Sequence, residues 1–486
     1  MSEPMRDNWS MNGANPDDLV DLLGRWASGR GPLYLLLAAR LRALIDDGLL
    51  HPDEPLPPDR VLARRLAVGR GTVVAAYDLL QQDGRVVRRQ GSGTRVAPLD
   101  PPAARSATGV MVNPLLLHIL HPPDDVQLLT CAAPPDPPAA LSEAYVEAGA
   151  RLAGARDMGY QLAGNPELRA ELAAYYTRRG LPTTAEEIIV TTGAQQALTL
   201  LTGLLVAPGD TVLTEVPTYP GALEVFRHAA AVIRPVVQDE AASAMRERPA
   251  LTYFVPTARN PDGAVMSDQA RRRLATLAAE HDVPLVDDEV HAELCFSGER
   301  PPPLAVFARG EQVITVGSLS KLVWGGLRVG WIRAAAPLVS RLARLRAVHD
   351  LGGEVVSQLA AAALLRRLDD IRQERVRKLR RRHDHLCAEL RARLPSWSFE
   401  PARGGQTIWV RLPRGDADSF SQVALRHGVA VPPGRSFDPL GGHATHLRLH
   451  FLFPEDELSR AVGDLAAAWA AYDGAGGTVS RRTLVV

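Results

Sequence analysis

The run VITVGSLSKLVWGGLRVGW, residues 313–331, decides how the larger part of this chain folds. Its first four residues are apolar or β-branched and predict a buried strand. Two hydroxyl side chains and a lysine follow, Ser318, Ser320 and Lys321, and Arg328 comes seven residues later. A lysine that forms an imine must lose its proton, and hydroxyls with an arginine suit a phosphate dianion. The run therefore predicts a strand end that holds a reactive amine beside anion-binding groups.

Lysine is scarce in this chain of 486 residues, because only Lys321 and Lys378 stand among its 55 basic residues. Lys378 lies in the run RVRKLR, residues 375–380, which is typical of a solvated basic helix. Lys321 is therefore the candidate for imine chemistry. The bias towards arginine is what GC-rich coding produces, and it carries no functional inference.

Apolar strands alternate with helical patterns on both sides of this run. We expect strands at residues 188–190, 211–213, 251–254, 284–286 and 313–316, and a long arginine-rich helical stretch at 338–394. Short strands at 407–412 and 446–451 and a final helix follow. This order predicts a mainly parallel α/β sheet with a smaller C-terminal α+β part.

Other short motifs of this part have both a structural and a functional interpretation. TTGAQQA, residues 191–197, joins a strand to a helix, and a helix N-terminus favours phosphate. Asp288 closes a strand, where a carboxylate either is solvated or pairs with a protonated pyridine nitrogen. Tyr219 either packs or stacks on a ring, and NPDG, residues 260–263, is a turn by composition. Arg448 interrupts an apolar strand, where it binds a carboxylate or forms a structural ion pair.

Residues 31–98 have a different pattern, with three helices followed by a hairpin. A first helix begins at Leu33 and stops before Gly48, Asp59 can cap a second, and a third runs from Arg70 to about Gln82. Two short strands then surround the glycine-rich tip QGSG. This order is typical of a winged helix-turn-helix.

The charge of this N-terminal region differs from that of the whole chain. Residues 31–97 contain ten arginines and seven acids, a net charge of +3, whereas the complete chain has a net charge of zero. Arginines at the third helix and the hairpin suit the phosphate backbone of DNA, although a solvated arginine-rich face has the same composition.

The remaining segments define the domain organisation. We expect a leader with one short helix at 1–30, the winged helix at 31–98, a Pro/Ala-rich linker at 99–138, the α/β domain at 139–475 and a tail at 476–486. The chain has neither an 18-residue apolar run nor a secretory leader, and its three cysteines lack metal-ligand spacing. These features predict a cytoplasmic protein with no membrane association and no metal site.

Taken together, the motifs resemble two known families. LPPDRVLA at 56–63, RGTV at 70–73 and RQGSGT at 89–94 resemble the GntR winged helix-turn-helix. The ordered series of Tyr160, GAQQ, PTYPG, NPDG, DDEVH, SLSK with Arg328, and Arg448 resembles the fold-type I pyridoxal phosphate (PLP) aminotransferases. A GntR winged helix joined through a linker to an aminotransferase-like domain resembles the MocR family of transcriptional regulators.

The resemblance implies roles for the matching residues. The catalytic residues would be Lys321, which forms the internal aldimine, and Asp288, which pairs with the pyridine nitrogen. The cofactor-binding residues would be Lys321, Gly193, Ala194, Gln195, Tyr219, Asn260, Asp288, His291, Ser318, Ser320 and Arg328. Arg448 would bind an effector carboxylate. The DNA-binding residues would be Arg60, Arg70, Gly71, Thr72, Arg89, Gly91, Ser92 and Gly93.

The sequence departs from the aminotransferase pattern at one position. Aminotransferases often have a tyrosine two or three residues after the aspartate, where it donates to the ring oxygen, and this chain has Val290 and His291 there. Either His291 takes over that role, or the ring oxygen has fewer donors, which would reduce turnover without preventing cofactor binding.

The resemblance implies a homodimer that binds a double-stranded DNA operator in response to PLP or to an amine or amino-acid effector. One alternative is a catalytically active PLP-dependent aminotransferase with an appended DNA-binding domain. A repressor that binds a metabolite without cofactor is disfavoured, because Lys321, Asp288 and Arg328 would then be unexplained together.

Overall fold

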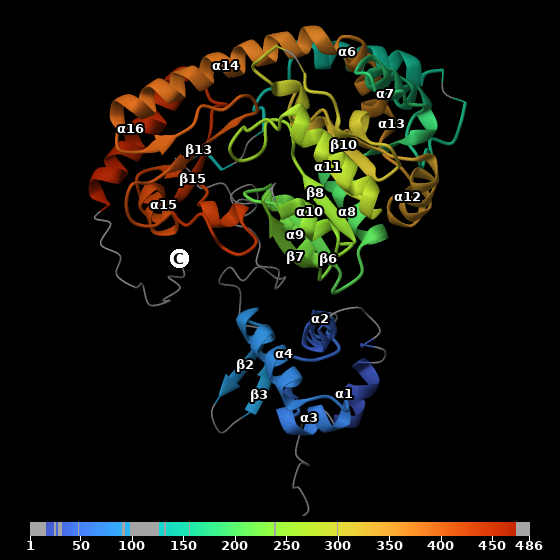
Figure 1. Cartoon of the computed structure of the whole chain (residues 1–486), viewed down its shortest axis with the longest axis vertical. Helices are drawn as coiled ribbons and strands as arrows, with labels where there is room; N and C mark the ends of the chain where they lie inside the picture. The colour runs from blue at the N-terminus through green and yellow to red at the C-terminus, as the bar shows by residue number, and fades with distance from the viewer. Residues whose placement is uncertain are drawn as a thin grey trace, which may run out of the picture. The chain divides into compact units, whose positions relative to one another are not determined.

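The computed structural model describes residues 16–23, 26–27, 32–46, 48–89, 93–97, 126–130, 133–154, 156–237, 240–298 and 300–472. These residues form an N-terminal and a larger C-terminal compact unit (Figure 1).

The N-terminal unit is a small helical core with a three-stranded sheet. Helix α4 buries Val73, Ala76, Tyr77 and Leu80, which recur at helical spacing and pack against the other helices. The hydroxyl of Tyr77 donates to the carbonyl of Pro57 at 2.9 Å, and this bond connects α4 with the turn before α3. The elements are α1 (Pro16–Leu23), α2 (Leu33–Asp46), β1 (Pro55–Leu56), α3 (Asp59–Arg65), α4 (Arg70–Gln82), β2 (Val86–Arg89) and β3 (Gly93–Val96).

Two details of this unit differ from the sequence expectation. Asp59 does not cap α3 but is its first residue, because Pro58 takes the cap position with an extended backbone. The Asp59 carboxylate instead accepts a hydrogen bond from Arg88 at 2.7 Å. The hairpin also gains a third strand, β1, which pairs antiparallel with β3 and is too short to show a sequence pattern.

A seven-stranded sheet forms the centre of the C-terminal unit. Its order is β5-β11-β10-β9-β8-β6-β7, and β6, β8, β9 and β10 are parallel neighbours. Strand β11 runs antiparallel to both β5 and β10 and is therefore reversed within the mainly parallel sheet. The strands are β5 (Ile188–Thr191), β6 (Thr211–Glu215), β7 (Val232–Val236), β8 (Leu251–Phe254), β9 (Leu285–Asp288), β10 (Val313–Ser318) and β11 (Gly330–Arg333).

Helices surround this sheet, and the long arginine-rich helical stretch expected at 338–394 is helical and consists of three helices, α12, α13 and α14. Leu351 and Gly352 have φ of +57° and +117°, a backbone that ends α12, and Arg367 separates α13 from α14. Figure 1 shows α14 as the long orange helix that reaches α16. The helices are α6 (Ala139–Leu152), α7 (Pro166–Arg178), α8 (Ala194–Leu205), α9 (Pro220–His228), α10 (Ala241–Met245), α11 (Asp268–His281), α12 (Ala336–His349), α13 (Val355–Arg366) and α14 (Leu368–Arg393).

The C-terminal part of this unit is a smaller α+β layer. An antiparallel sheet contains β12 (Ser398–Phe399), β13 (Thr407–Arg411) and β15 (His446–His450), and α15 (Ala417–Arg426) and α16 (Glu455–Ala471) accompany it. Strand β14 (Val429–Ala430) pairs in parallel with β4 (Gln127–Leu128), which lies within the stretch 99–138 that the sequence suggested as a linker. Among the described residues, no helix is both long and apolar enough to cross a membrane.

Candidate functional site

A cavity of about 140 Å³ lies in the C-terminal unit, where β9 and β10 end near the start of α8. In open α/β sheets, ligands commonly bind in the crevice at the carboxyl ends of the strands. Every residue that the sequence suggested for cofactor binding lines this cavity, apart from Gly193. The lining residues are Ala194, Gln195, Tyr219, Val255, Asn260, Asp288, Val290, His291, Ser318, Ser320, Lys321 and Arg328.

Asp288 is the last residue of β9 and is held by two hydrogen bonds. The hydroxyl of Tyr253 donates to its Oδ2 at 2.6 Å, and the backbone N–H of Val290 donates to its Oδ1 at 3.0 Å. Burial raises the pKa of Asp288 to about 6, while these two hydrogen bonds and the charge of Lys321 act in the opposite direction. The carboxylate is therefore fixed in position and ionised at neutral pH.

Lys321 follows β10 and faces the same cavity as Asp288. Its backbone carbonyl accepts a hydrogen bond from the Gln406 side chain at 3.1 Å, which anchors the turn after the strand. The charge of Lys321 lowers the pKa of both Asp288 and His291, so the three groups lie close enough to influence one another. Lys378 is exposed on α14, as the sequence suggested.

An anion cradle borders the cavity beside Lys321. Ser318 Oγ and Ser320 Oγ lie 3.0 Å apart, and Arg328 donates to the carbonyl of Thr192 at 2.5 Å. Gly193 lies behind the wall as the cap of α8, where its φ of +113° disfavours any side chain. The positive end of α8, the two hydroxyls and the guanidinium together suit a phosphate.

Polar contacts fix Tyr219 and Asn260 on another part of the wall. The Tyr219 hydroxyl donates to Gln195 Oε1 at 3.1 Å, and Gln195 Nε2 donates to the carbonyl of Gly221 at 2.9 Å. Asn260 Oδ1 accepts a hydrogen bond from Arg448 Nη1 at 3.3 Å. This orientation leaves the amide NH₂ of Asn260 as a donor for an oxygen atom.

His291 is a buried imidazole without a normal hydrogen bond. Its side chain is buried, and neither ring nitrogen has a partner of acceptable geometry among the described residues. Burial lowers the pKa of His291 to about 3, and the charges of Lys321 and Arg448 act in the same direction, whereas a carbonyl contact with Ala258 opposes them. The ring is therefore neutral and has one N–H to donate.

Arg448 does not line the cavity but lies directly behind Asn260. It is buried in β15, and its Nη2 donates to the carbonyl of Thr130. Its guanidinium carbon lies 5.1 Å from the ring centroid of Phe437. The residue suggested for an effector carboxylate is thus already engaged by backbone and side-chain oxygens.

Sequence reasoning missed Tyr253, Val255 and Gln406. Tyr253 stands in the apolar strand LTYF, and Gln406 precedes a strand, so neither has a local pattern that separates it from core or surface residues. Only the pairing of β8 with β9 brings Tyr253 beside Asp288.

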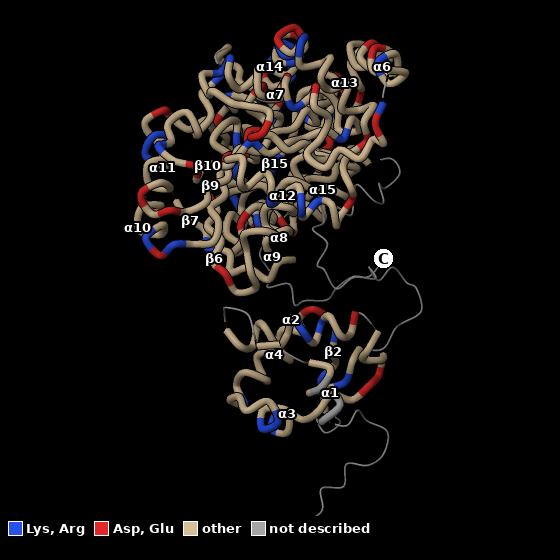
Figure 2. Tube along the Cα trace, turned by 90° about the vertical axis from the view of Figure 1, so that its right-hand side faces the viewer, with Lys and Arg blue, Asp and Glu red and all other residues tan. Residues whose placement is uncertain are grey.

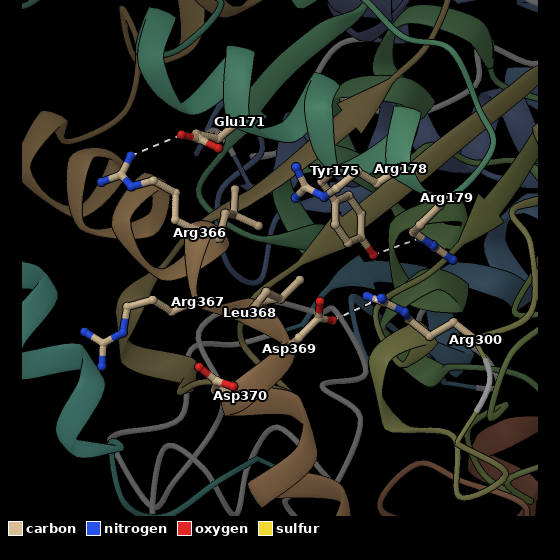
Figure 3. A pocket seen from close by; sticks show the side chains of 11 residues that line it. Glu171, Tyr175, Arg178, Arg179, Arg300, Arg366, Arg367, Leu368, Asp369 and Asp370 are labelled. Atoms are coloured by element: carbon tan, nitrogen blue, oxygen red, sulfur yellow. Dashed lines mark hydrogen bonds and ion pairs between the residues drawn. The ribbon is translucent and has the colours of Figure 1, made fainter.

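A second, arginine-rich cavity of about 300 Å³ lies between α7, the junction of α13 and α14, and Arg300 (Figure 3). Arg179 pairs with Glu289 at 2.7 Å with both side chains almost fully buried, and it donates to the Tyr175 hydroxyl at 2.8 Å. Tyr175 in turn donates to Glu293 at 2.5 Å. These contacts hold the segment that follows Asp288, so the cavity supports the candidate site.

The N-terminal unit presents its candidate DNA-binding residues at the start of α4 and on α3. Arg60, Arg70 and Gly71 are exposed and Thr72 is half-buried, and Figure 2 shows the basic residues along α3. The Arg70 side chain is 58% exposed and its nearest acid, Asp59, is 4.0 Å away. Gly93 begins β3 with a φ of +80°.

Three of the candidate DNA-binding positions at the hairpin tip are not fully described. The side chain of Arg89 and all of Gly91 and Ser92 lie outside the described residues.

Comparisons with known proteins agree with this division of the chain. The family model "Bacterial regulatory proteins, gntR family" matches residues 33–96, and "Aminotransferase class I and II" matches residues 129–465. The N-terminal unit is therefore a DNA-binding domain of the GntR type, and the C-terminal unit is a fold-type I aminotransferase-like domain.

Relatives that contain both parts identify the family more closely. An HTH-type transcriptional regulator of Bacillus subtilis, YisV, is 28% identical, with 91% of this chain and 96% of that protein covered. The probable rhizopine catabolism regulatory protein MocR of Rhizobium meliloti is 30% identical, with 85% and 88% covered. The chain belongs to this MocR family of transcriptional regulators.

A solved structure matches the C-terminal domain. The α-aminoadipate aminotransferase LysN of Thermus thermophilus, complexed with a phosphopyridoxyl-leucine, has a TM-score of 0.66 and 27% identity, with 75% of this chain and 96% of that chain covered.

Proposed function

We propose that this regulator binds PLP in the cavity around Lys321 and that PLP, or an amine or amino acid that reacts with it, changes its affinity for a DNA operator in the cytoplasm. One observation carries the proposal. A single cavity gathers the better placed of the two lysines, a buried carboxylate and an anion cradle from distant parts of the chain.

The residues of the cavity fit the parts of PLP. Ser318, Ser320 and Arg328, with the start of α8, would hold the phosphate. Asp288, fixed by Tyr253, would keep a proton on the pyridine nitrogen. When bound, PLP supplies an aldehyde that condenses with primary amines and a ring that withdraws electrons.

The ring oxygen of PLP would have two donors in this chain. The Asn260 amide is oriented by Arg448, and the neutral imidazole of His291 is buried without a normal partner. A buried polar group without a partner is costly, and a bound acceptor would remove that cost. This favours the alternative in which His291 donates the hydrogen bond to the ring oxygen that the missing tyrosine would donate. The phosphopyridoxyl ligand of the T. thermophilus relative supports the same cofactor class.

We also propose a homodimer that presents two winged helices to a double-stranded operator. Large apolar side chains are exposed on the C-terminal domain: Met158 is 87% exposed, Tyr160 67% and Val348 84%. A side chain at Gly352 would collide with the backbone of Gln161, so the segments that carry these side chains are close together. An exposed apolar surface of this kind suits a protein partner, and a second copy would account for it.

Operator titrations with and without PLP test the proposal, using the full chain and its Lys321→Ala variant. We expect PLP, alone or with an amino acid, to change the operator affinity of the wild type and not that of the variant. The presence of Lys321, Asp288 and Arg328 in the cavity also suits transaminase activity. Equal affinities in all four titrations together with rapid transamination would favour the aminotransferase alternative.

A further inference from the structure

Tyr253 is a buried tyrosine of β8 whose hydroxyl bonds to the carboxylate at the candidate cofactor cavity. Its side chain has no exposed surface, and its hydroxyl donates to Asp288 Oδ2 at 2.6 Å. Asp288 lines the cavity together with Lys321, whereas Tyr253 itself does not. Any effect of this hydroxyl on a ligand in the cavity therefore passes through the Asp288 carboxylate.

The Tyr253 ring is held by its strand and by a neighbouring helix. Strand β8 lies between β6 and β9, which places Tyr253 beside Thr214 and Val286. Phe226 of α9 packs edge-on against the ring, with the centroids 5.9 Å apart and the planes at 69°. Phe226 is also fully buried, and close packing of this kind keeps a side chain in one rotamer. The hydroxyl therefore meets Asp288 in one fixed direction.

The hydroxyl of Tyr253 remains a donor at any pH at which the protein is studied. Burial raises the pKa of Tyr253 well above the usual range, and the charge of Asp288 acts in the same direction. A carboxylate that accepts a hydrogen bond is a weaker base than one without it. Burial raises the pKa of Asp288, whereas the Tyr253 hydroxyl, the Val290 N–H and the charge of Lys321 lower it. Of these three, Tyr253 alone can be substituted without changing a residue that lines the cavity.

We propose that Tyr253 is a positioning residue that decides where the proton lies between Asp288 and the ring nitrogen of PLP. This deepens the proposed function, on which it rests. With Tyr253 as donor, the carboxylate is the weaker base of the pair, so the proton lies on the nitrogen and the ring withdraws electrons. Without this donor, the carboxylate takes the proton and the ring nitrogen becomes neutral. Only this one proton changes place, and no other bond forms or breaks.

Tyr175 provides a matched control for Tyr253. It is also buried, and its hydroxyl also donates to a carboxylate, Glu293, but at the arginine-rich cavity. Phenylalanine at either position keeps the ring and removes one buried hydrogen bond. A merely structural role would therefore give the two variants the same consequences for the cavity around Lys321.

NMR spectroscopy of the full-length protein tests the inference, with PLP that is isotope-labelled at its ring nitrogen. The chemical shift of this nitrogen distinguishes a protonated from an unprotonated ring. We expect the protonated value in the wild type and in Tyr175→Phe. In Tyr253→Phe, the signal should move most of the way to the unprotonated value. A wild-type signal in Tyr253→Phe, or equal displacement in both variants, overturns the inference while the proposed function stands.

The wild type alone tests the premise. If it forms no adduct between PLP and Lys321, the proposed function fails, and the inference fails with it. If the adduct forms but its ring nitrogen is unprotonated, the inference fails alone.

A second replacement keeps the test decisive if Tyr253→Phe does not fold. A tyrosine with one fluorine beside its hydroxyl, incorporated at position 253 alone, has nearly the same size and is a stronger donor. It should move the nitrogen signal in the opposite direction, further towards the protonated value. A shift towards the unprotonated value, or no shift, would contradict the role of Tyr253.

Discussion

Two of the cavities in the C-terminal domain are connected with one segment, residues 288–293, which contributes lining residues to the first and bonds to lining residues of the second. They differ in how their polar groups are paired. Asp288 and His291 face the cavity around Lys321, whereas Glu289 and Glu293 bond to Arg179 and Tyr175 of the arginine-rich cavity. The second cavity is the larger, about 300 Å³ against about 140 Å³. Size and arginine content therefore do not identify the ligand site.

Pairing distinguishes the two cavities. Most arginines of the larger cavity are bound to acids: Arg179 to Glu289, Arg300 to Glu293 and Asp369, Arg366 to three glutamates and Arg367 to Glu143. In the smaller cavity, the His291 ring is buried without a normal partner. Paired charges stabilise a structure, whereas a buried polar group that lines a cavity without a partner is a candidate for contact with a bound ligand.

The largest expected effect is at Lys321. Because Lys378 is exposed on α14, only Lys321 is placed to react with PLP. Lys321→Ala should abolish the adduct that borohydride traps between the protein and PLP, and Lys378→Ala should retain it. Mass spectrometry of the reduced protein measures both variants. Loss of the adduct in Lys378→Ala alone would place the reactive amine outside the cavity.

The next effect tests the structural role of the arginine-rich cavity. Arg179→Met leaves Glu289 buried without its cation, and breaking a buried pair in this way costs about 3–5 kcal/mol of unfolding free energy. Arg367→Ala is the control, because its pair with Glu143 is about half exposed and such pairs contribute about 0–1 kcal/mol. Denaturant unfolding measures both variants. Equal stability of the two would show that the Arg179 pair is not what holds the segment after Asp288.

A third prediction compares two arginines of the DNA-binding domain that differ in how closely acids pair with them. Arg88 is bound to Asp59 and Asp78, whereas Arg70 is exposed at the start of α4. Arg70→Ala should weaken operator binding by about 1–3 kcal/mol if it contacts a base. Arg88→Ala should weaken it less, because Arg88 is neutralised within the domain. A gel-shift titration that ranks the two variants the other way would contradict this.

The sequence predicted much of the fold because the relevant patterns are local. The strand and turn around Lys321, the three helices before the wing and the motifs that line the cavity each lie within a few residues. The reversed strand β11 and the break of the long helical stretch at Leu351 and Gly352 depend on tertiary packing and backbone conformation. The site contacts that were missed join distant parts of the chain, as Tyr253 with Asp288 and Arg448 with Thr130 do.

The smallest effect tests the unmatched imidazole itself, in the protein without PLP. Burial lowers the pKa of His291 to about 3 from an ordinary 6.5, so the folded state binds a proton less readily than the unfolded state. Stability is therefore lost as the pH falls below 6.5, and the loss continues down to the folded pKa. His291→Gln cannot titrate, so its stability relative to the wild type should rise by about 0.8 kcal/mol at pH 6, compared with pH 8.

Denaturant unfolding at the two pH values measures this, with PLP left out so that no bound acceptor alters the ring. A difference between the variant and the wild type that does not depend on pH would mean that His291 titrates normally, and the neutral donor proposed for the ring oxygen would have to be another group.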